Sequence, residues 1–201
     1  MTSEKRDKFL QIWESEGSPK EKALKATEVL GEEAGALAQE LLGVPKALFV
    51  RGGVVKADES LIITGGEFKI PFNIEVEPGG ELVISPGTVL KFAPKTGIVC
   101  HGLLRVIGNP QERVRLLPQE PAEGWAGVRL EGPDTWGSVL TFCEIAEARG
   151  MLYEGDEEVF GGGLLIADTK IVKVHACIFR ECRADYGAGL MAVGVTDLEV
   201  C

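Results

Sequence analysis

Residues 177 to 190 read CIFRECRADYGAGL, a stretch that fits neither an amphipathic helix nor an ordinary strand. Two cysteines stand five residues apart with Phe179 between them, and Gly187 and Gly189 follow before a leucine. Small and apolar residues at such close intervals indicate a narrow interior. The glycines indicate a sharp change of direction, because tight corners need backbone conformations that a side chain penalises.

The same phrase occurs earlier in the chain. The segment SVLTFCEI (138–145) matches VKVHACIF (172–179), so that Cys143 corresponds to Cys177, Leu140 to Val174 and Ile145 to Phe179. The glycine turn repeats as well, since GGGL at 161–164 returns as GAGL at 187–190. We expect Val172, Val174, Cys177 and Phe179 to face the interior of a repeated coil.

The spacing of the repeats favours a solenoid. TDLEVC at 196–201 starts the phrase a third time, 24 residues after Cys177, whereas Cys143 and Cys177 are 34 residues apart. These distances predict one coil of short parallel strands per roughly 20 to 30 residues, with about ten residues inserted in one coil. The competing hypothesis is an antiparallel sandwich, which would pair residues 82–84 with 89–92 as a hairpin.

The chain divides near residue 46. Residues 1–46 predict two helices, the first around Phe9–Trp13 and the second over 19–42, which starts with a capping box at Ser18 and Glu21. This segment either caps the chain's own fold or binds a partner. Residues 47–201 predict the β-helix, because glycine becomes dense and β-branched runs recur at 74–77, 82–85, 89–92, 97–100, 103–107 and 114–117.

These residues resemble a known family. CIFREC followed by GAGL is similar to the repeats of right-handed parallel β-helix proteins of the pectate-lyase-like superfamily, and so are SPGTVLKF (85–92), GLLRVIGNPQERVRLLP (102–118) and WAGVRL (125–130). The resemblance covers about residues 50–201 and implies a mainly β solenoid, here the N-terminal part of a longer one. Cys182 and Ala148 stand where those repeats carry a turn asparagine, so we expect no asparagine ladder.

Composition limits the partners and the compartment. The formal charge of −10 disfavours nucleic acid, which repels such a surface, and no apolar run reaches the roughly 18 residues of a membrane span. The opening residues lack signal-peptide features and the five cysteines lack CxxC spacing. We therefore expect reduced thiols and a cytoplasmic protein, unless a targeting segment has been removed. Aligned thiols are expected to lie too far apart for a relaxed disulfide, whereas Cys177 and Cys182 could approach across a corner.

Acidic residues provide the candidates for catalysis and metal binding. The resemblance implies polysaccharide lyases with clustered aspartates for Ca²⁺, or hydrolases with grouped aspartates, but here Asp168 and Asp185 stand singly. We expect them to be solvated turn residues. The insertion supplies candidate Ca²⁺ ligands whose spacing is not that of an EF-hand, namely Glu154, Asp156, Glu157 and Glu158. We expect no obligatory cofactor.

Aromatic and histidine residues provide weaker candidates. Tyr153, Trp125 and Trp136 could stack on a sugar ring, although Trp125 also fits a packing role under a turn. His101 and His175 lack a third ligand residue nearby, so structural roles are expected rather than a zinc site.

Three functions are compatible with this pattern. The favoured hypothesis is a non-catalytic scaffold or binding module that presents its solenoid surface to a protein or glycan partner. The alternatives are a carbohydrate-active lyase or hydrolase and an oligomerising structural spacer. The apolar strand at 198–200 also predicts end-to-end self-association through the C-terminal edge.

Overall fold

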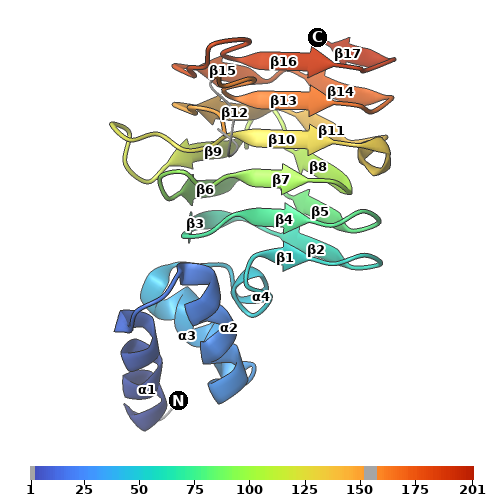
Figure 1. Cartoon of the computed structure of the whole chain (residues 1–201). Helices are drawn as coiled ribbons and strands as arrows, with labels where there is room; N and C mark the ends of the chain where they lie inside the picture. Colours follow the sequence, from blue (N-terminus) through green and yellow to red (C-terminus); the bar gives the residue numbers. More distant parts are fainter. Residues whose placement is uncertain (1–2, 152–157) are drawn as a thin grey trace.

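The computed structural model describes residues 3–151 and 158–201, and shows a group of helices at one end of a stack of short strands (Figure 1). The chain climbs away from the helices coil by coil, so the two termini lie at opposite ends of the molecule (Figure 1). The predicted mainly β solenoid with a helical N-terminal segment is confirmed.

The strands form three sheets in which every pairing between strands is parallel. Sheet A contains, in spatial order, β1 (Val54–Val55), β4 (Ile74–Val76), β7 (Ile98–Cys100), β10 (Val128–Glu131), β13 (Leu164–Ala167) and β16 (Leu190–Val193). Sheet B contains β2 (Ser60–Ile63), β5 (Glu81–Ile84), β8 (Leu103–Ile107), β11 (Val139–Thr141), β14 (Val172–His175) and β17 (Leu198–Val200). Sheet C contains β3 (Gly66–Ile70), β6 (Thr88–Phe92), β9 (Val114–Pro118), β12 (Cys143–Ala146) and β15 (Ile178–Arg180).

Each coil therefore contributes one strand to each sheet in turn, which is a parallel β-helix. The predicted alignment of repeats is confirmed, because Leu140 pairs with Val174, Ile145 with Phe179 and Leu164 with Leu190. β5 and β6 belong to different sheets, so the hairpin that an antiparallel sandwich would need does not form.

The third repeat is aligned differently from the prediction. Val174 pairs with Val200, which places Cys201 beside His175 rather than above Cys177. The reason is coil length: 26 residues separate Val174 from Val200, two more than the cysteine spacing assumed.

The expectation that aligned thiols lie far apart is also wrong. The sulfur atoms of Cys143 and Cys177 are 3.2 Å apart.

Corners between sheets use left-handed backbone at repeated positions. Between sheets B and C, Phe142 and Ala176 have φ of 45° and 51°, and each directly precedes a stacked cysteine. Residues other than glycine therefore also make corners, in addition to the glycines that the sequence indicates. Glycine is required where the chain enters sheet A, because a Cβ on Gly127 would meet the Gly162 carbonyl oxygen at 2.4 Å.

The helices form the base of the solenoid. They are α1 (Ser3–Glu14), α2 (Pro19–Leu30), α3 (Glu33–Leu42) and the single turn α4 (Lys46–Phe49). The capping box at Ser18 is confirmed. One continuous helix over 19–42 is not observed, because Gly31 adopts a φ of 62°, which ends α2 before α3 begins.

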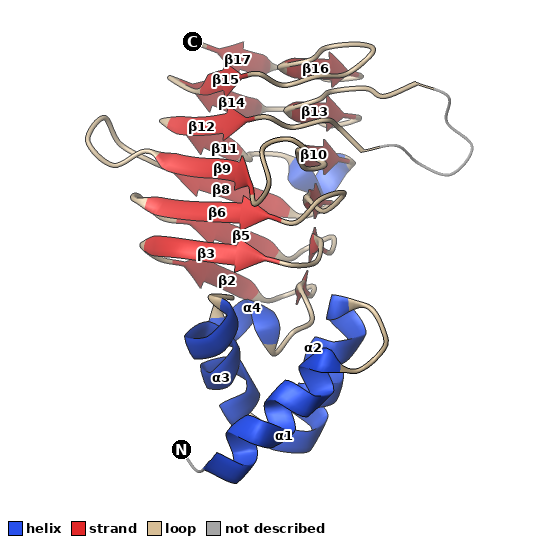
Figure 2. Ribbon diagram, turned by 90° about the vertical axis from the view of Figure 1, so that its left-hand side faces the viewer, coloured by secondary structure: helices blue, strands red, loops and turns tan. Residues whose placement is uncertain are grey.

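The helical segment and the coils share one hydrophobic core. Phe9 and Phe49 belong to the same buried cluster as Leu61 and Ile70 of the first coil. The backbone N–H of Lys69 in β3 donates to the carbonyl of Gly43 at 2.8 Å, and α3 and α4 lie directly below β2 and β3 (Figure 2). The helices thus cover the lower edge of the solenoid, the capping role that the sequence left open.

The inward-facing residues follow the predicted alternation. Val172 and Val174 are 0% and 1% exposed, whereas Cys177 and Phe179 are half-buried. Among the described helices, none has the length and apolar content needed to cross a bilayer.

Candidate functional site

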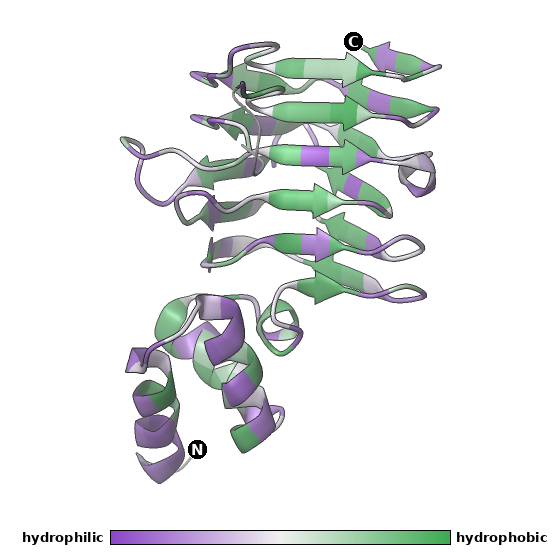
Figure 3. Ribbon diagram, in the orientation of Figure 1, coloured by the Kyte–Doolittle hydropathy of each residue, from purple (hydrophilic) through white to green (hydrophobic). Residues whose placement is uncertain are grey.

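The outer face of sheet A carries side chains that stack from coil to coil. In β4, β7 and β10 the first and third residues are buried, so the second residue points outward. The register places Glu75 beside Val99 and Val99 beside Arg129. His101 follows β7 and Glu131 ends β10, which gives a second outward column. Figure 3 shows the corresponding hydrophilic segments of β4 and β10 on this face.

These columns line a groove of about 510 Å³ over three coils. Its lining combines carboxylates, one imidazole, one guanidinium and apolar surface: Glu75, Glu77, Val99, His101, Arg129, Glu131 and Met151. Met151 comes from the segment that follows β12, so the insertion predicted from the repeat spacing borders the groove.

Ion pairs hold part of the groove in place. Lys20 of α2 binds the carboxylate of Glu75 at 3.0 Å, which ties the helical base to the rim. The guanidinium of Arg129 contacts Glu131, with Nε 3.0 Å from Oε1. His101 Nδ1 lies 3.2 Å from the carbonyl oxygen of Glu131.

Glu77 differs from the other two acids of the groove. Its carboxylate accepts a hydrogen bond from the backbone N–H of Ala57 at 3.4 Å, and it makes no ion pair with the described residues. The groove therefore offers one carboxylate that the described cations leave unneutralised.

The candidate catalytic aspartates are not brought together. Asp168 follows β13 at the corner between sheets A and B, with φ of 52°. Asp185 precedes β16 at the opposite corner, where its carboxylate accepts from the N–H of Val159 at 2.7 Å. A four-residue strand, about 13 Å long, separates the two corners. Paired carboxylates of glycoside hydrolases lie closer, about 5 to 9.5 Å apart.

Three of the four Ca²⁺ candidates lie outside the described residues, namely Glu154, Asp156 and Glu157. The sugar candidate Tyr153 lies outside them as well. Glu158 is described and exposed, and its carboxylate accepts from the Tyr186 hydroxyl at 3.4 Å. Within residues 3–151 and 158–201, no group of three or more acidic, histidine or cysteine side chains is placed to hold a metal ion.

The two tryptophan candidates lie in different environments. Trp125 is 1% exposed, its ring stacks on Phe92 at 4.5 Å, and its Nε1 donates to the carbonyl of Ala146 at 2.8 Å. Its ring is thus occupied by packing. Trp136 follows a short turn (Pro133–Thr135) and is 58% exposed, but it does not line the groove.

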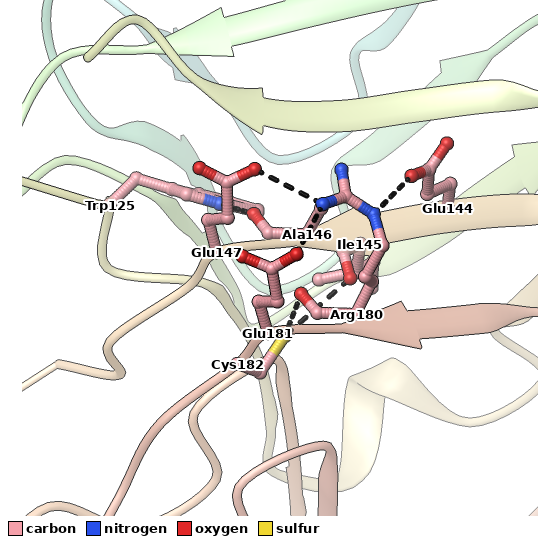
Figure 4. Close-up of polar contacts among 8 residues, drawn as sticks. All are labelled: Trp125, Glu144, Ile145, Ala146, Glu147, Arg180, Glu181 and Cys182. Carbon is pink, nitrogen blue, oxygen red and sulfur yellow. Dashed lines mark hydrogen bonds and ion pairs between the residues drawn. The ribbon is translucent and has the colours of Figure 1, made fainter. Parts of the chain in front are cut away.

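A second polar cluster lies on sheet C (Figure 4). Arg180 binds Glu144 at 3.2 Å, Glu147 at 3.4 Å and Glu181 at 2.9 Å, so one guanidinium joins two adjacent coils. Its hydrogen bond to Glu144, followed by the one to Glu181, raises the pKa of Arg180. An exposed, already paired cation of this kind contributes little to stability and offers no free anion site.

The sequence interpretation missed the groove on sheet A. The signal was present, because Glu75, Val99 and Arg129 each occupy the middle of an apolar triplet. It becomes visible only after the coils are aligned by their strand register.

Neither a protein-family model nor a solved structure significantly matches the chain. Over 85 residues it is 33% identical to the Protein bark beetle of Drosophila melanogaster, which covers 42% of this chain. The match spans 3% of that protein's length.

Proposed function

We propose that this chain is a non-catalytic binding module, a β-helix of the pectate-lyase-like type, whose sheet A groove takes a basic, extended segment of a protein partner. The observation that carries the proposal is the Glu77 carboxylate, which no described cation neutralises and which lines a groove that spans three successive coils. Two coil spacings correspond to about 10 Å, enough for about three residues of an extended chain.

Charge and surface chemistry favour a peptide over a glycan. Lysine or arginine side chains of a partner would pair with Glu77, which no described cation neutralises. Val99 supplies apolar surface between Glu75 and Arg129 in the first column. Sugar sites commonly use aromatic side chains for stacking, and no aromatic ring other than the His101 imidazole is among the described residues that line this groove.

Binding of model peptides tests the proposal. A short peptide that alternates lysine and valine should shift the backbone NMR signals of Val99, His101 and Arg129, and its glutamate counterpart should not. Glu77→Gln should weaken binding about two- to fivefold, the range of one exposed ion pair, whereas Glu67→Gln on sheet C should leave it unchanged. Val99→Arg should abolish peptide binding, because the longer side chain would fill the groove.

Two results would overturn the proposal. Equal binding of both peptides would show that the carboxylates do not select the ligand. Saturable binding of a neutral glycan at the same signals, without peptide binding, would favour the glycan alternative.

The enzymatic alternative has a separate test. Uronate polymers with added Ca²⁺ should give no unsaturated product, measured by its ultraviolet absorbance. Turnover that Asp168→Asn or Asp185→Asn removes would establish a lyase instead.

A further inference from the structure

Cys143 and Cys177 are equivalent residues of adjacent coils at the corner between sheets B and C. Each follows a residue in the left-handed region, Phe142 or Ala176, and the next pair up the chain, Glu144 and Ile178, is in register. Aligned strands lie about 4.8 Å apart, within the usual range of Cα separations in disulfides, about 4.4 to 6.8 Å. The sulfur atoms are 3.2 Å apart, so bond formation needs an approach of only about 1.2 Å.

The two thiols differ in exposure and in hydrogen bonding. Cys143 is fully buried and its S–H donates to the sulfur of Cys177, which is half-buried. This hydrogen bond, aided by the nearby charge of Arg113, lowers the pKa of Cys177 to about 7. The same hydrogen bond and burial raise the pKa of Cys143.

Arg113 is fixed beside the pair. Its guanidinium donates to the carbonyl of Ala176 at 2.7 Å and lies over the Phe142 ring, with Cζ 5.6 Å from the centroid. Both contacts are to the residues that precede the two cysteines, so the cation stays at the corner where a Cys177 thiolate would form.

We propose that Cys177 and Cys143 form a hydroperoxide-sensitive thiol pair that closes reversibly into a disulfide between adjacent coils. Cys177 is the attacking thiol, because it is the more exposed and carries the cation beside it. Cys143 is the resolving thiol, held at hydrogen-bond distance.

The chemistry balances in two steps. The Cys177 thiolate attacks one peroxide oxygen, the O–O bond breaks, and the leaving alkoxide takes a proton to become an alcohol, leaving a sulfenic acid on Cys177. The Cys143 sulfur then loses its proton and attacks the Cys177 sulfur, and hydroxide leaves as water. Two electrons pass from the thiols to the hydroperoxide, and an external dithiol returns them when it reduces the disulfide.

The other described thiols are placed less favourably for this reaction. Cys100 is buried, which raises the pKa of its thiol to about 12. Burial also raises the pKa of Cys182, whose sulfur contacts the carbonyl of Ile145 at 3.5 Å rather than another thiol. Cys201 is exposed and lies 2.9 Å from His175 Nδ1, but no second thiol of the described residues contacts its sulfur to resolve a sulfenic acid.

Peptide mapping after oxidation tests the pair. The reduced full chain is treated with a few equivalents of hydrogen peroxide, free thiols are blocked, and peptides are analysed by mass spectrometry. A peptide linking Cys143 to Cys177 is expected, and dithiothreitol should remove the link. In Cys143→Ala, dimedone should label a sulfenic acid on Cys177. The matched control Cys182→Ala should form the link at the unchanged rate.

Either of two results would overturn the proposal. The first is a Cys143–Cys177 pair that stays reduced while Cys201 or Cys182 is oxidised. The second is sulfenic acid on Cys143 at the wild-type rate in Cys177→Ala, which would reverse the assigned roles. Circular dichroism of each variant before oxidation confirms that the coils are intact.

Discussion

Ile145 and Phe179 occupy one position in successive coils but differ in burial. Ile145 is 0% exposed because it has a coil on each side, pairing with Leu116 below and Phe179 above. Phe179 belongs to the outermost strand of sheet C and is half-buried. We predict that Ile145→Ala lowers the free energy of unfolding by about 2 to 5 kcal/mol and Phe179→Ala by only about 1 to 2 kcal/mol. Urea unfolding measures both, and a larger loss for Phe179→Ala would contradict the assigned burial.

The reactivity of Cys177 should depend on its neighbour. Since the Cys143 hydrogen bond lowers the pKa of Cys177 to about 7, its alkylation by iodoacetamide should rise with pH through that value. Removing the donor in Cys143→Ala should raise the pKa toward the ordinary value of about 8.5, so the rate should rise at higher pH. Cys182→Ala is the control. An alkylation midpoint that does not move in Cys143→Ala would show that the hydrogen bond leaves the Cys177 thiolate unaffected.

At the scale of elements, glycines in one column let successive coils approach. A Cβ on Gly97 would lie 2.4 Å from the carbonyl oxygen of Gly127, whereas one on Gly189 would meet only the side chain of Phe179, at 3.3 Å or more. We predict that Gly97→Ala costs about 1 to 3 kcal/mol and that Gly189→Ala costs less, since a side chain yields more easily than a stacked backbone. Thermal unfolding of the two variants compares them directly. Equal losses of stability would show that the interior coils accommodate a methyl group at Gly97 despite the close Gly127 carbonyl oxygen.

The strands and their stacking were predictable because each coil repeats a local pattern. Alternation placed β4 to β9 correctly, and the matching of Leu140 with Val174 gave the register. Failures arose where the outcome depends on three-dimensional context. The break at Gly31 depends on how the helices pack, and the position of Cys201 depends on a coil two residues longer than assumed. The groove depends on side chains from three coils that no linear window brings together.

At the scale of the molecule, the helices act as the lower cap. They cover the edge of the first coil, where β3 donates a hydrogen bond to Gly43. We predict that a chain beginning at Ala47 associates as its concentration rises, because unpaired strand edges and apolar surface become exposed. Light scattering across a concentration series, with the full chain as control, measures this. If the shortened chain forms a smaller assembly than the full chain, the result would support the spacer hypothesis, in which the helices assemble the protein. An unchanged assembly size would show that the helices neither cap the solenoid nor assemble it.

The insertion between β12 and β13 leaves the strand pairing on both sides intact, because β12 still pairs with β15 and β10 with β13. Corner loops can therefore change length without changing the strand register, and the solenoid can be lengthened by adding whole coils. A duplicated coil would extend the groove by one step of about 4.8 Å and add one more outward side chain to each column. The length of such a groove changes in fixed steps, and the hydrogen bonds between strands determine the size of each step. The length of ligand that fits therefore depends on the number of coils rather than on the residues that touch the ligand.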